Sequence, residues 1–276
     1  MRRRRTRAAR WAAGAVVVAG AAAAGLVVSH HGSSPSGCTA VVDAVPYRLD
    51  LEQAANATTI AAVGKRLGLG DHAVTVALAA ALQESGLHNL RHGDRDSLGL
   101  FQQRPSQGWG TPAQILTPRL AAAAFYQRLA RVEGWASLPV TQAAQQVQHS
   151  ADAGAYAQWE PRARALARVL TGEIAAGLTC RFGGATGGAA PTALAAAVAA
   201  ELGEPSLGTP LSPARGWTVA GWLVGHADRF DVRSVSFAGV RWTPGSGSWV
   251  PTSGPAGTVE VRTGPGGAAF DPSPSP

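Results

Sequence analysis

The stretch DHAVTVALAAALQESGL, residues 71–87, is predicted to form an α-helix that carries an acid in its last turn. Apolar residues recur at spacings of three and four, Asp71 is placed to cap the start of the helix, and Gly86 is placed to end it. Glu84 therefore lies at the end of an apolar helix. Negative charge is disfavoured there by about 0.3–1 kcal/mol, and partial burial acts in the same direction. Both effects favour the protonated carboxyl group, although a glutamate at a helix end is also a common solvated surface residue.

A polar loop follows this helix, within residues 88–103, and gathers two further acids and two glutamines. Its segment GDRDS carries Asp94 and Asp96, and SLGLFQQ carries Gln102 and Gln103. A packed helix needs none of these side chains. A carboxylic acid that stays protonated near neutral pH, beside polar groups that can orient a substrate, is what general-acid cleavage of a glycosidic bond requires.

The charge of the chain is concentrated at its start. The net charge of +7 over 276 residues includes +6 from six arginines within residues 2–10, so the remainder is close to neutral. No basic stripe is left to neutralise phosphates, and we therefore expect no nucleic-acid partner. A hydrophobic content of 46% is ample for a buried core.

An apolar segment, residues 11–28, follows these arginines. As a helix it would span about 27 Å, close to the ~30 Å of a bilayer core. No small-x-small cleavage site follows it, so an uncleaved anchor in the cytoplasmic membrane is favoured over a removed signal peptide. In either case the arginines stay in the cytoplasm and the rest of the chain is exported.

The two cysteines, Cys38 and Cys180, are expected to form a disulfide because the chain is exported. A lipid-modified Cys38 is the rival interpretation, and the preceding SPSG lacks the leucine that such a signal uses.

The fold class expected is α+β, with a mainly α domain followed by a small α+β domain. Residues 1–37 are the arginine-rich start, the signal or anchor helix and a spacer; 38–182 form the first domain; 183–191 are a Gly/Ala linker; 192–263 form the second domain; 264–276 are a disordered tail. The periodicity predicts helices over 53–69, 71–83, 117–135, 141–148 and 161–177. In the second domain it predicts helices over 192–203 and 216–230 and strands over 232–242 and 258–263.

The pair LQESGL and SLGLFQ resembles the Glu-Ser and Gly-Leu-Met-Gln motifs of soluble lytic transglycosylases and goose-type lysozymes, with Phe101 in place of methionine. Exported bacterial proteins with a lysozyme-like domain are similar over a longer span, roughly residues 50–175. The resemblance implies a lysozyme-like fold and cleavage of peptidoglycan glycan strands.

The resemblance also implies roles for individual residues. Glu84 would donate a proton to the oxygen between N-acetylmuramic acid and N-acetylglucosamine, and in a transglycosylase would then act as base on the sugar's own 6-hydroxyl. Ser85 would orient Glu84 or the substrate, and Gln102 would contact an N-acetyl group or the glutamate. Local turn chemistry is the alternative for Ser85 and Gln102.

The role of Asp94 and Asp96 would distinguish a hydrolase from a transglycosylase. An inverting hydrolase needs a second carboxylate about 6.5–9.5 Å from the acid to activate water, whereas a transglycosylase needs none. The favoured alternative is that both aspartates brace the turn through backbone amides. His88 and His92 lie in the same loop without metal-ligand spacing, so we expect no metal and no cofactor.

One departure from the family concerns its Ala-Tyr-Asn-Ala-Gly stretch, whose tyrosine approaches the catalytic glutamate. The comparable region here is AAQQVQHSADAGAY, in which Gln148 or Tyr156 would serve instead. Trp109 and Tyr126 are candidates for lining a sugar cleft, and core packing explains them equally well.

The second domain resembles the C-terminal part of D-alanyl-D-alanine carboxypeptidase-like metallopeptidases. It holds a single histidine, His226, so no zinc site can be assembled, and an inactive wall-binding or interaction module is expected. Its tryptophans are expected to be mostly core, with a ligand-facing subset as the alternative: Trp217, Trp222, Trp242 and Trp249.

The sequence thus predicts a monomeric protein of the cell envelope, anchored or secreted, that cleaves peptidoglycan glycan strands through Glu84. The rival is a non-catalytic protein that keeps a lysozyme-like cleft to bind the cell wall or a partner.

Overall fold

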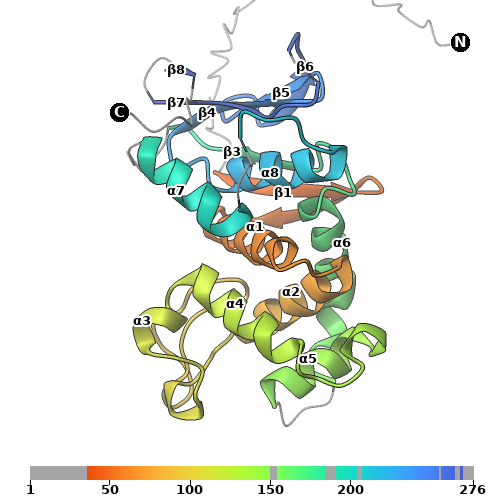
Figure 1. The fold of residues 1–276 in the computed structure, drawn as a ribbon, viewed down its shortest axis with the longest axis vertical. Coiled ribbons are helices and arrows are strands. Elements are labelled where there is room, and N and C mark those ends of the chain that lie inside the picture. Colours follow the sequence, from red (N-terminus) through yellow and green to blue (C-terminus); the bar gives the residue numbers. More distant parts are fainter. Residues whose placement is uncertain are drawn as a thin grey trace, which may run out of the picture. The chain divides into compact units, whose positions relative to one another are not determined.

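The computed structural model describes residues 36–149, 154–184, 191–203, 207–254, 256–264 and 268–269 (Figure 1). The expected anchor, residues 11–28, lies outside the described residues, as do most of the linker and most of the tail. In the part of the chain that is described, no helix is long and apolar enough to cross a membrane.

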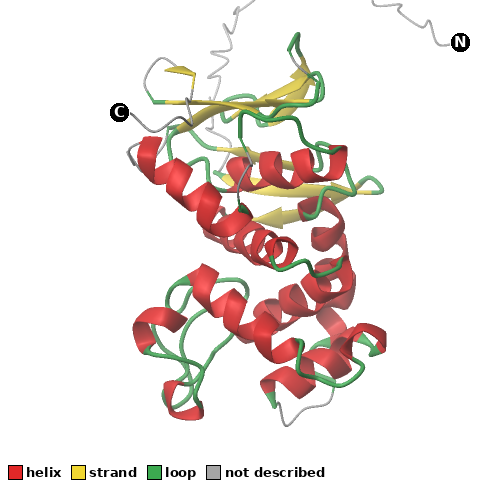
Figure 2. Cartoon of the chain, in the orientation of Figure 1, coloured by secondary structure: helices red, strands yellow, loops and turns green. Residues whose placement is uncertain are grey.

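The described residues form an α+β fold with eight α-helices and two antiparallel sheets, which confirms the expected α+β class (Figure 2). The helices are α1 (Leu51–Arg66), α2 (Asp71–Ser85), α3 (Pro112–Ile115), α4 (Pro118–Leu129), α5 (Val140–Gln148), α6 (Glu160–Leu170), α7 (Pro191–Leu202) and α8 (Pro213–Gly225). The strands are β1 (Gly37–Val42), β2 (Val45–Leu49), β3 (Leu178–Arg181), β4 (Val232–Phe237), β5 (Val240–Thr243), β6 (Ser248–Pro251), β7 (Glu260–Thr263) and β8 (Ala268–Ala269). Short 3-10 turns are η1 (Pro105–Gln107), η2 (Trp135–Ser137) and η3 (Ala157–Trp159).

Helix α1 is the centre of the packing, in contact with α2, α4, α6, α7 and α8. It is built from small residues that let its neighbours approach closely. A Cβ at Gly64 would lie 2.8 Å from the hydroxyl of Tyr126 on α4. On another side, a Cβ at Gly225 of α8 would lie 2.8 Å from the side chain of Thr58 on α1. Larger side chains at these positions would push the helices apart.

Helix α2 is buried from Ala73 to Leu82, and it ends as predicted at Gly86, which adopts the left-handed conformation with φ of 62°. Its start at Asp71 also agrees with the predicted range, but the prediction that Asp71 caps the helix was wrong. Gly70 is the N-cap, and Asp71 is the first helical residue and makes no side-chain capping hydrogen bond. Here Asp71 instead pairs with Lys65 at 3.0 Å.

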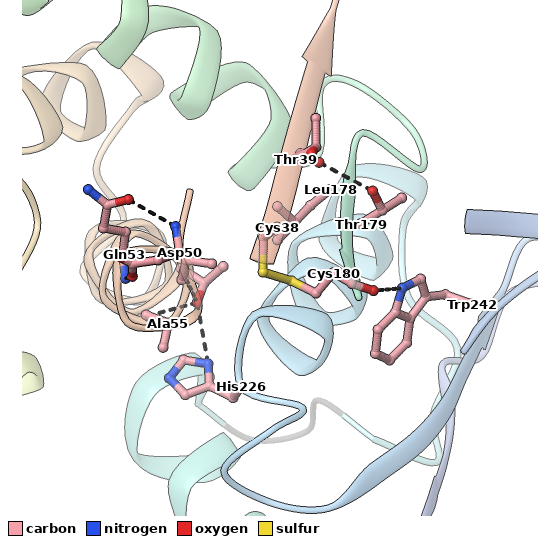
Figure 3. The surroundings of a disulfide bond; sticks show 12 residues. Cys38, Thr39, Asp50, Gln53, Ala55, Leu178, Thr179, Cys180, His226 and Trp242 are labelled. Atoms are coloured by element: carbon pink, nitrogen blue, oxygen red, sulfur yellow. Dashed lines mark hydrogen bonds between the residues drawn. A yellow bond between two sulfur atoms is a disulfide. The ribbon is translucent and has the colours of Figure 1, made fainter. Parts of the chain in front are cut away.

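A three-stranded sheet, in the order β2-β1-β3, frames the mainly helical region and was not predicted. Its strands are four to six residues long, too short for a strong local pattern, and the β1–β3 pair joins residues 142 positions apart. Cys38 and Cys180 face each other in that pair and form the expected disulfide (Figure 3).

The second sheet has the order β6-β5-β4-β7-β8. The strand predicted over 232–242 is in fact a hairpin, because Ala238 and Gly239 both have positive φ, 48° and 77°, and form the two-residue turn that suits tightly paired strands. Strand β6 was not predicted. Strand β8 pairs with β7 inside the region expected as a tail.

The second sheet and α8 pack against elements of the first region. Two indole N–H groups on the β5–β6 hairpin donate to backbone oxygens of β3, Trp242 to Cys180 at 3.0 Å and Trp249 to Leu178 at 2.9 Å. These bonds satisfy the free edge of β3, which would otherwise be an open site for strand pairing. Trp217, Trp222 and Trp242 are buried, as expected for core residues.

His226, the lone histidine of the second region, is buried between α8 and α1. Its ring lies 3.3 Å from the hydroxyls of both Thr58 and Thr59 and stacks on Trp222. Burial lowers the pKa of His226, and the nearby charge of Glu201 and the Trp222 carbonyl oppose this shift only in part. The ring is therefore neutral in the folded protein at neutral pH.

We predict that removing the disulfide lowers the free energy of unfolding by about 3–5 kcal/mol, because the bond closes a very long loop in the unfolded chain. Urea denaturation of the Cys38→Ala/Cys180→Ala variant checks this. Reductant should destabilise the wild type by a similar amount and leave the variant unchanged; equal stability of variant and wild type would contradict the expectation.

We predict that His226 makes the protein less stable as the pH falls below about 6.5. Below that pH the His226 ring binds a proton more readily in the unfolded state than in the folded state, so the free energy of unfolding falls. His88, discussed below, acts in the opposite sense, so the measurement is the difference in pH slope between the wild type and His226→Gln from pH 7 to 5. An identical slope in the two proteins would refute the assignment.

Candidate active site at the C-terminal end of helix α2

Glu84 is partly buried at the end of α2 and accepts a hydrogen bond from a buried tyrosine. The hydroxyl of Tyr156, whose side chain is fully buried, donates to Oε1 of Glu84 at 2.8 Å. Of the two residues expected to approach Glu84 from the 143–156 region, the structure brings Tyr156 to it. Within the described residues, Oε2 of Glu84 has no hydrogen-bond partner, so one carboxyl oxygen is held and the other is available.

The residues on either side of Glu84 are held by different segments. Oε1 of Gln83 accepts from the indole N–H of Trp159 at 2.7 Å and from Gln158 at 3.2 Å. The hydroxyl of Ser85 donates to the carbonyl of Leu100 at 2.7 Å. Ser85 therefore ties α2 to the SLGLFQ loop. Three neighbouring side chains fix the last turn of α2 from three directions.

Each of the four residues that follow this turn, 86–89, forms a hydrogen bond with a side chain at the start of α1. Gln53 donates to the carbonyl of Gly86 at 2.9 Å, and Asn56 donates to that of Leu87 at 2.8 Å. His88 Nε2 lies 2.9 Å from Oδ2 of Asp50, and the N–H of Asn89 donates to Glu52 at 2.9 Å. Leu87 is held in the left-handed region, with φ of 67°, although it is buried and carries a Cβ. Its conformation costs about 1–2 kcal/mol, which the surrounding contacts offset.

Asp50 also caps α1, with its other oxygen accepting from the N–H of Gln53 at 2.8 Å. Burial of the ring lowers the pKa of His88, but the hydrogen bond and charge of Asp50 raise it by more, helped by Ser85 and Glu52. The net pKa of His88 lies above its ordinary value of 6.5. His88 is a structural residue at this helix junction.

The SLGLFQ loop is a tight hairpin closed by paired backbone hydrogen bonds between Leu98 and Gln103. Gly99, with φ of 75°, sits so close to α3 that a Cβ would lie 2.7 Å from the carbonyl of Ile115. Gln102 has φ of 47°, and its amide donates to the carbonyls of His92 and Gly99 at 3.3 and 3.2 Å. These contacts fit the alternative of local turn chemistry for Gln102 better than the expected contact with Glu84.

Asp96 braces the loop. Oδ1 accepts from Arg104 at 2.8 Å, and Oδ2 accepts from the N–H of Ser106 at 2.8 Å. The Arg104 guanidinium, followed by the Ser106 amide, holds the pKa of Asp96 well below its usual range. Asp94 is 88% exposed and lies 3.9 Å from Arg95. Both oxygens of Asp96 are thus used to hold the loop against η1, in agreement with the bracing alternative.

The aromatic candidates for a sugar cleft lie in the core. Tyr126 is buried and donates to the carbonyl of Ile60 at 2.9 Å, and burial raises its pKa. Trp109 is 9% exposed and is covered by the guanidinium of Arg128, 3.5 Å from the ring centre. Gln148 donates to the carbonyl of Phe101 at 2.8 Å and so holds the same loop as Ser85.

Among the surface pockets of the described residues, two are large, and neither of these includes Glu84 in its lining. One, of about 600 Å³, lies beside the disulfide. The other, of about 480 Å³, lies where the ends of α1, α6 and α7 meet the start of α8. Among the described residues no group of three or more histidine, cysteine, aspartate or glutamate side chains is placed to hold a metal ion.

Several residues of this site were missed by the sequence analysis. The polar face at the start of α1 and the partners of Gln83 are separated from α2 by 31 to 76 positions, and no short motif marks them. The one local signal was the capping box formed by Asp50 and Gln53, which predicts a helix start but not its second use at Gly86.

No family model matches the chain, and no curated protein matches it in sequence. The function of this site is therefore inferred from its residues and contacts.

We predict that Asn56→Ala lowers the free energy of unfolding by about 1–3 kcal/mol, because the buried carbonyl of Leu87 loses its partner. Gln127→Ala, at an exposed amide of α4, is the matched control and should change stability by no more than about 0.5 kcal/mol. Chemical denaturation of both variants checks this, and equal effects would show that the buried hydrogen bond does not hold the junction.

Proposed function

We propose that this protein cleaves the glycan strands of peptidoglycan, with Glu84 as the general acid. The observation that carries the proposal is the hydrogen bond from the buried Tyr156 hydroxyl to Oε1 of Glu84 at 2.8 Å. It fixes one oxygen of a carboxyl group at the end of an apolar helix and leaves Oε2 as the site from which a proton can be delivered. The resemblance of LQESGL and SLGLFQ to the lytic transglycosylase and goose-type lysozyme motifs supports the same assignment.

The chemistry begins with protonated Glu84, which donates its proton to the oxygen between N-acetylmuramic acid and N-acetylglucosamine. The bond from the muramic acid C1 to that oxygen breaks as an oxocarbenium-like centre develops. Tyr156 keeps the carboxyl group in one orientation, and the contacts of Gln83 and Ser85 hold the helix turn that presents it. A fixed acid contributes typically 10²–10⁴-fold to such a step.

The second half of the reaction favours the transglycosylase form of this proposal. An inverting hydrolase needs a second carboxylate to activate water. Asp96 uses both oxygens on Arg104 and Ser106, and Asp94 is exposed at the loop surface. With neither committed to water activation, the Glu84 carboxylate itself takes the proton of the muramic acid 6-hydroxyl, which attacks C1 and gives a 1,6-anhydro end.

A non-catalytic wall-binding or interaction protein is the second candidate, and one observation favours it. The two pockets lie away from Glu84, and Ser85, Gln102 and Asp96 direct their polar groups to the protein's own backbone and side chains. In that case the helix end is a rigid structural junction.

The setting of the proposed activity is the cell envelope. We propose that the arginine-rich start and residues 11–28 hold the chain in the cytoplasmic membrane or direct its export, and that it works as a monomer on glycan strands. The region of residues 192–263, which resembles a carboxypeptidase-like module, is proposed to be inactive toward peptide bonds. The disulfide suits an oxidising compartment.

We predict that Glu84→Gln lowers the rate of glycan cleavage by at least about 100-fold, and that Tyr156→Phe lowers it by about 10-fold, the effect of one hydrogen bond to the acid. Muropeptide release from purified peptidoglycan, followed by mass spectrometry, measures both the rate and the ends formed. The expected products carry 1,6-anhydro ends.

Glu133→Gln, the same change at an exposed glutamate after α4, is the matched control and should keep the wild-type activity. Cleavage by Glu84→Gln at the wild-type rate would exclude Glu84 as the acid. Cleavage by neither protein, with retained binding to peptidoglycan, would establish the non-catalytic candidate, and reducing ends would establish hydrolysis.

A further inference from the structure

We infer that the three-stranded sheet carries a second ligand site, an anion-binding pocket between Arg48 and Arg181. This site is independent of the chemistry proposed for Glu84. It is the 600 Å³ pocket beside the disulfide, and the residues around it include Thr39, Thr179 and Asp50 (Figure 3).

The strand register builds the floor of this pocket. Thr39 on β1 pairs with Arg48 on β2 and with Thr179 on β3, so these three residues form one row across the sheet. Two positions along, Gly37 pairs with Arg181. Because side chains alternate along a strand, these residues share the face opposite to the buried cysteines. Gly37 adds no side chain, which leaves the space beside Arg181 open.

Arg181 is held in place before any ligand binds. One Nη donates to the carbonyl of Ser246 at 2.6 Å, and a Cβ at Gly247 would lie only 2.9 Å from Nε of Arg181. The side chain is exposed but lies against the β5–β6 turn. This hydrogen bond uses one of the five N–H groups of the guanidinium. Arg48 is exposed at the opposite edge of the row.

The charge of the lining favours an anion. Asp50 is the one carboxylate among the described lining residues, and its two oxygens face the N–H of Gln53 and the ring of His88. The negative charge of Asp50 is thus compensated by its own partners. The two arginines, Arg48 and Arg181, then make the lining of the pocket positively charged. Guanidinium groups bind carboxylate and phosphate through paired N–H donors.

The threonine hydroxyl groups at the floor of the pocket indicate what the ligand carries besides its anionic group. The Thr39 hydroxyl can donate to and accept from hydroxyl or amide groups, and Ser36 lies at the rim. The Thr179 hydroxyl donates to the carbonyl of Thr39 at 3.5 Å and keeps its lone pairs for a donor of the ligand (Figure 3). The ligand class is therefore a compact oxyanion, a carboxylate or phosphate, on a hydroxylated or amide-bearing body. A sugar acid or a sugar phosphate has this chemistry.

Calorimetric titration of the full-length protein in a neutral detergent tests the site with three probes of one body. N-acetylmuramic acid supplies a carboxylate, N-acetylglucosamine 6-phosphate supplies a phosphate, and neutral N-acetylglucosamine is the control. We expect at least one anionic probe to bind and the neutral sugar to bind at least 10-fold more weakly. The anionic probe that binds identifies the group recognised; equal affinity for all three, or no binding of either anion, overturns the inference.

Variants locate the site. Arg48→Gln/Arg181→Gln should weaken anion binding at least 10-fold, and Thr179→Val, which keeps the β-branched shape of the strand residue, should weaken it several-fold. Arg131→Gln, an exposed arginine outside the pocket, should leave it unchanged. Unchanged affinity in the folded double variant would refute the site.

The result is separable from that for Glu84. We expect Glu84→Gln to bind the anion with wild-type affinity, and Arg48→Gln/Arg181→Gln to keep the glycan-cleaving rate of the wild type. Loss of anion binding in Glu84→Gln would place the bound probe at the helix end instead and overturn the second site.

Discussion

Hydrogen bonds from the start of α1 fix the direction in which the chain leaves α2. Four consecutive residues, 86–89, are each held by a different side chain from the first turns of α1. An apolar helix with a glycine after it can end in many directions. Here the direction is set by hydrogen bonds to Gly86 and Leu87, one of them buried. The position of Glu84 is a consequence of this junction, and so is the alignment of the loop that packs on it through Ser85.

Helix α1 can do this because it serves two purposes along its length. Its middle is made of small residues, so that α4 and α8 approach closely at Gly64 and Thr58. Its first turns carry polar side chains that reach across to α2. The buried cluster of Thr58, Thr59 and His226 joins the later helices to the same element. The proposed active site and the packing of the C-terminal region are thus organised by one helix.

The sequence predicted the features that are local and regular. Long apolar periodicities predicted the longer helices, and Gly86 predicted the end of α2. The strands of the first sheet were missed because each is short, and β3 pairs with β1 across up to 144 residues. The β4–β5 turn was missed because Ala238–Gly239 is a weaker turn signal than Asn-Gly.

At the candidate site, Tyr156 was one of two residues expected to approach Glu84, since a family pattern pointed to that region. The hydrogen-bond partners of Gln83 and Leu87 could not be predicted, because a hydrogen bond between residues far apart in the chain produces no pattern in either local sequence. The contacts of Asp96 fit the bracing alternative, but its partners Arg104 and Ser106 follow from the fold of the loop and are not marked in the sequence.

Delivery of a proton from Glu84 to a glycosidic oxygen can be tested with a crystal structure of the Glu84→Gln protein soaked with a peptidoglycan tetrasaccharide. We expect a glycosidic oxygen about 2.6–3.2 Å from the side chain at position 84, on the side away from the Tyr156 hydroxyl. A tetrasaccharide bound only elsewhere on the protein, with position 84 facing solvent alone, would contradict it.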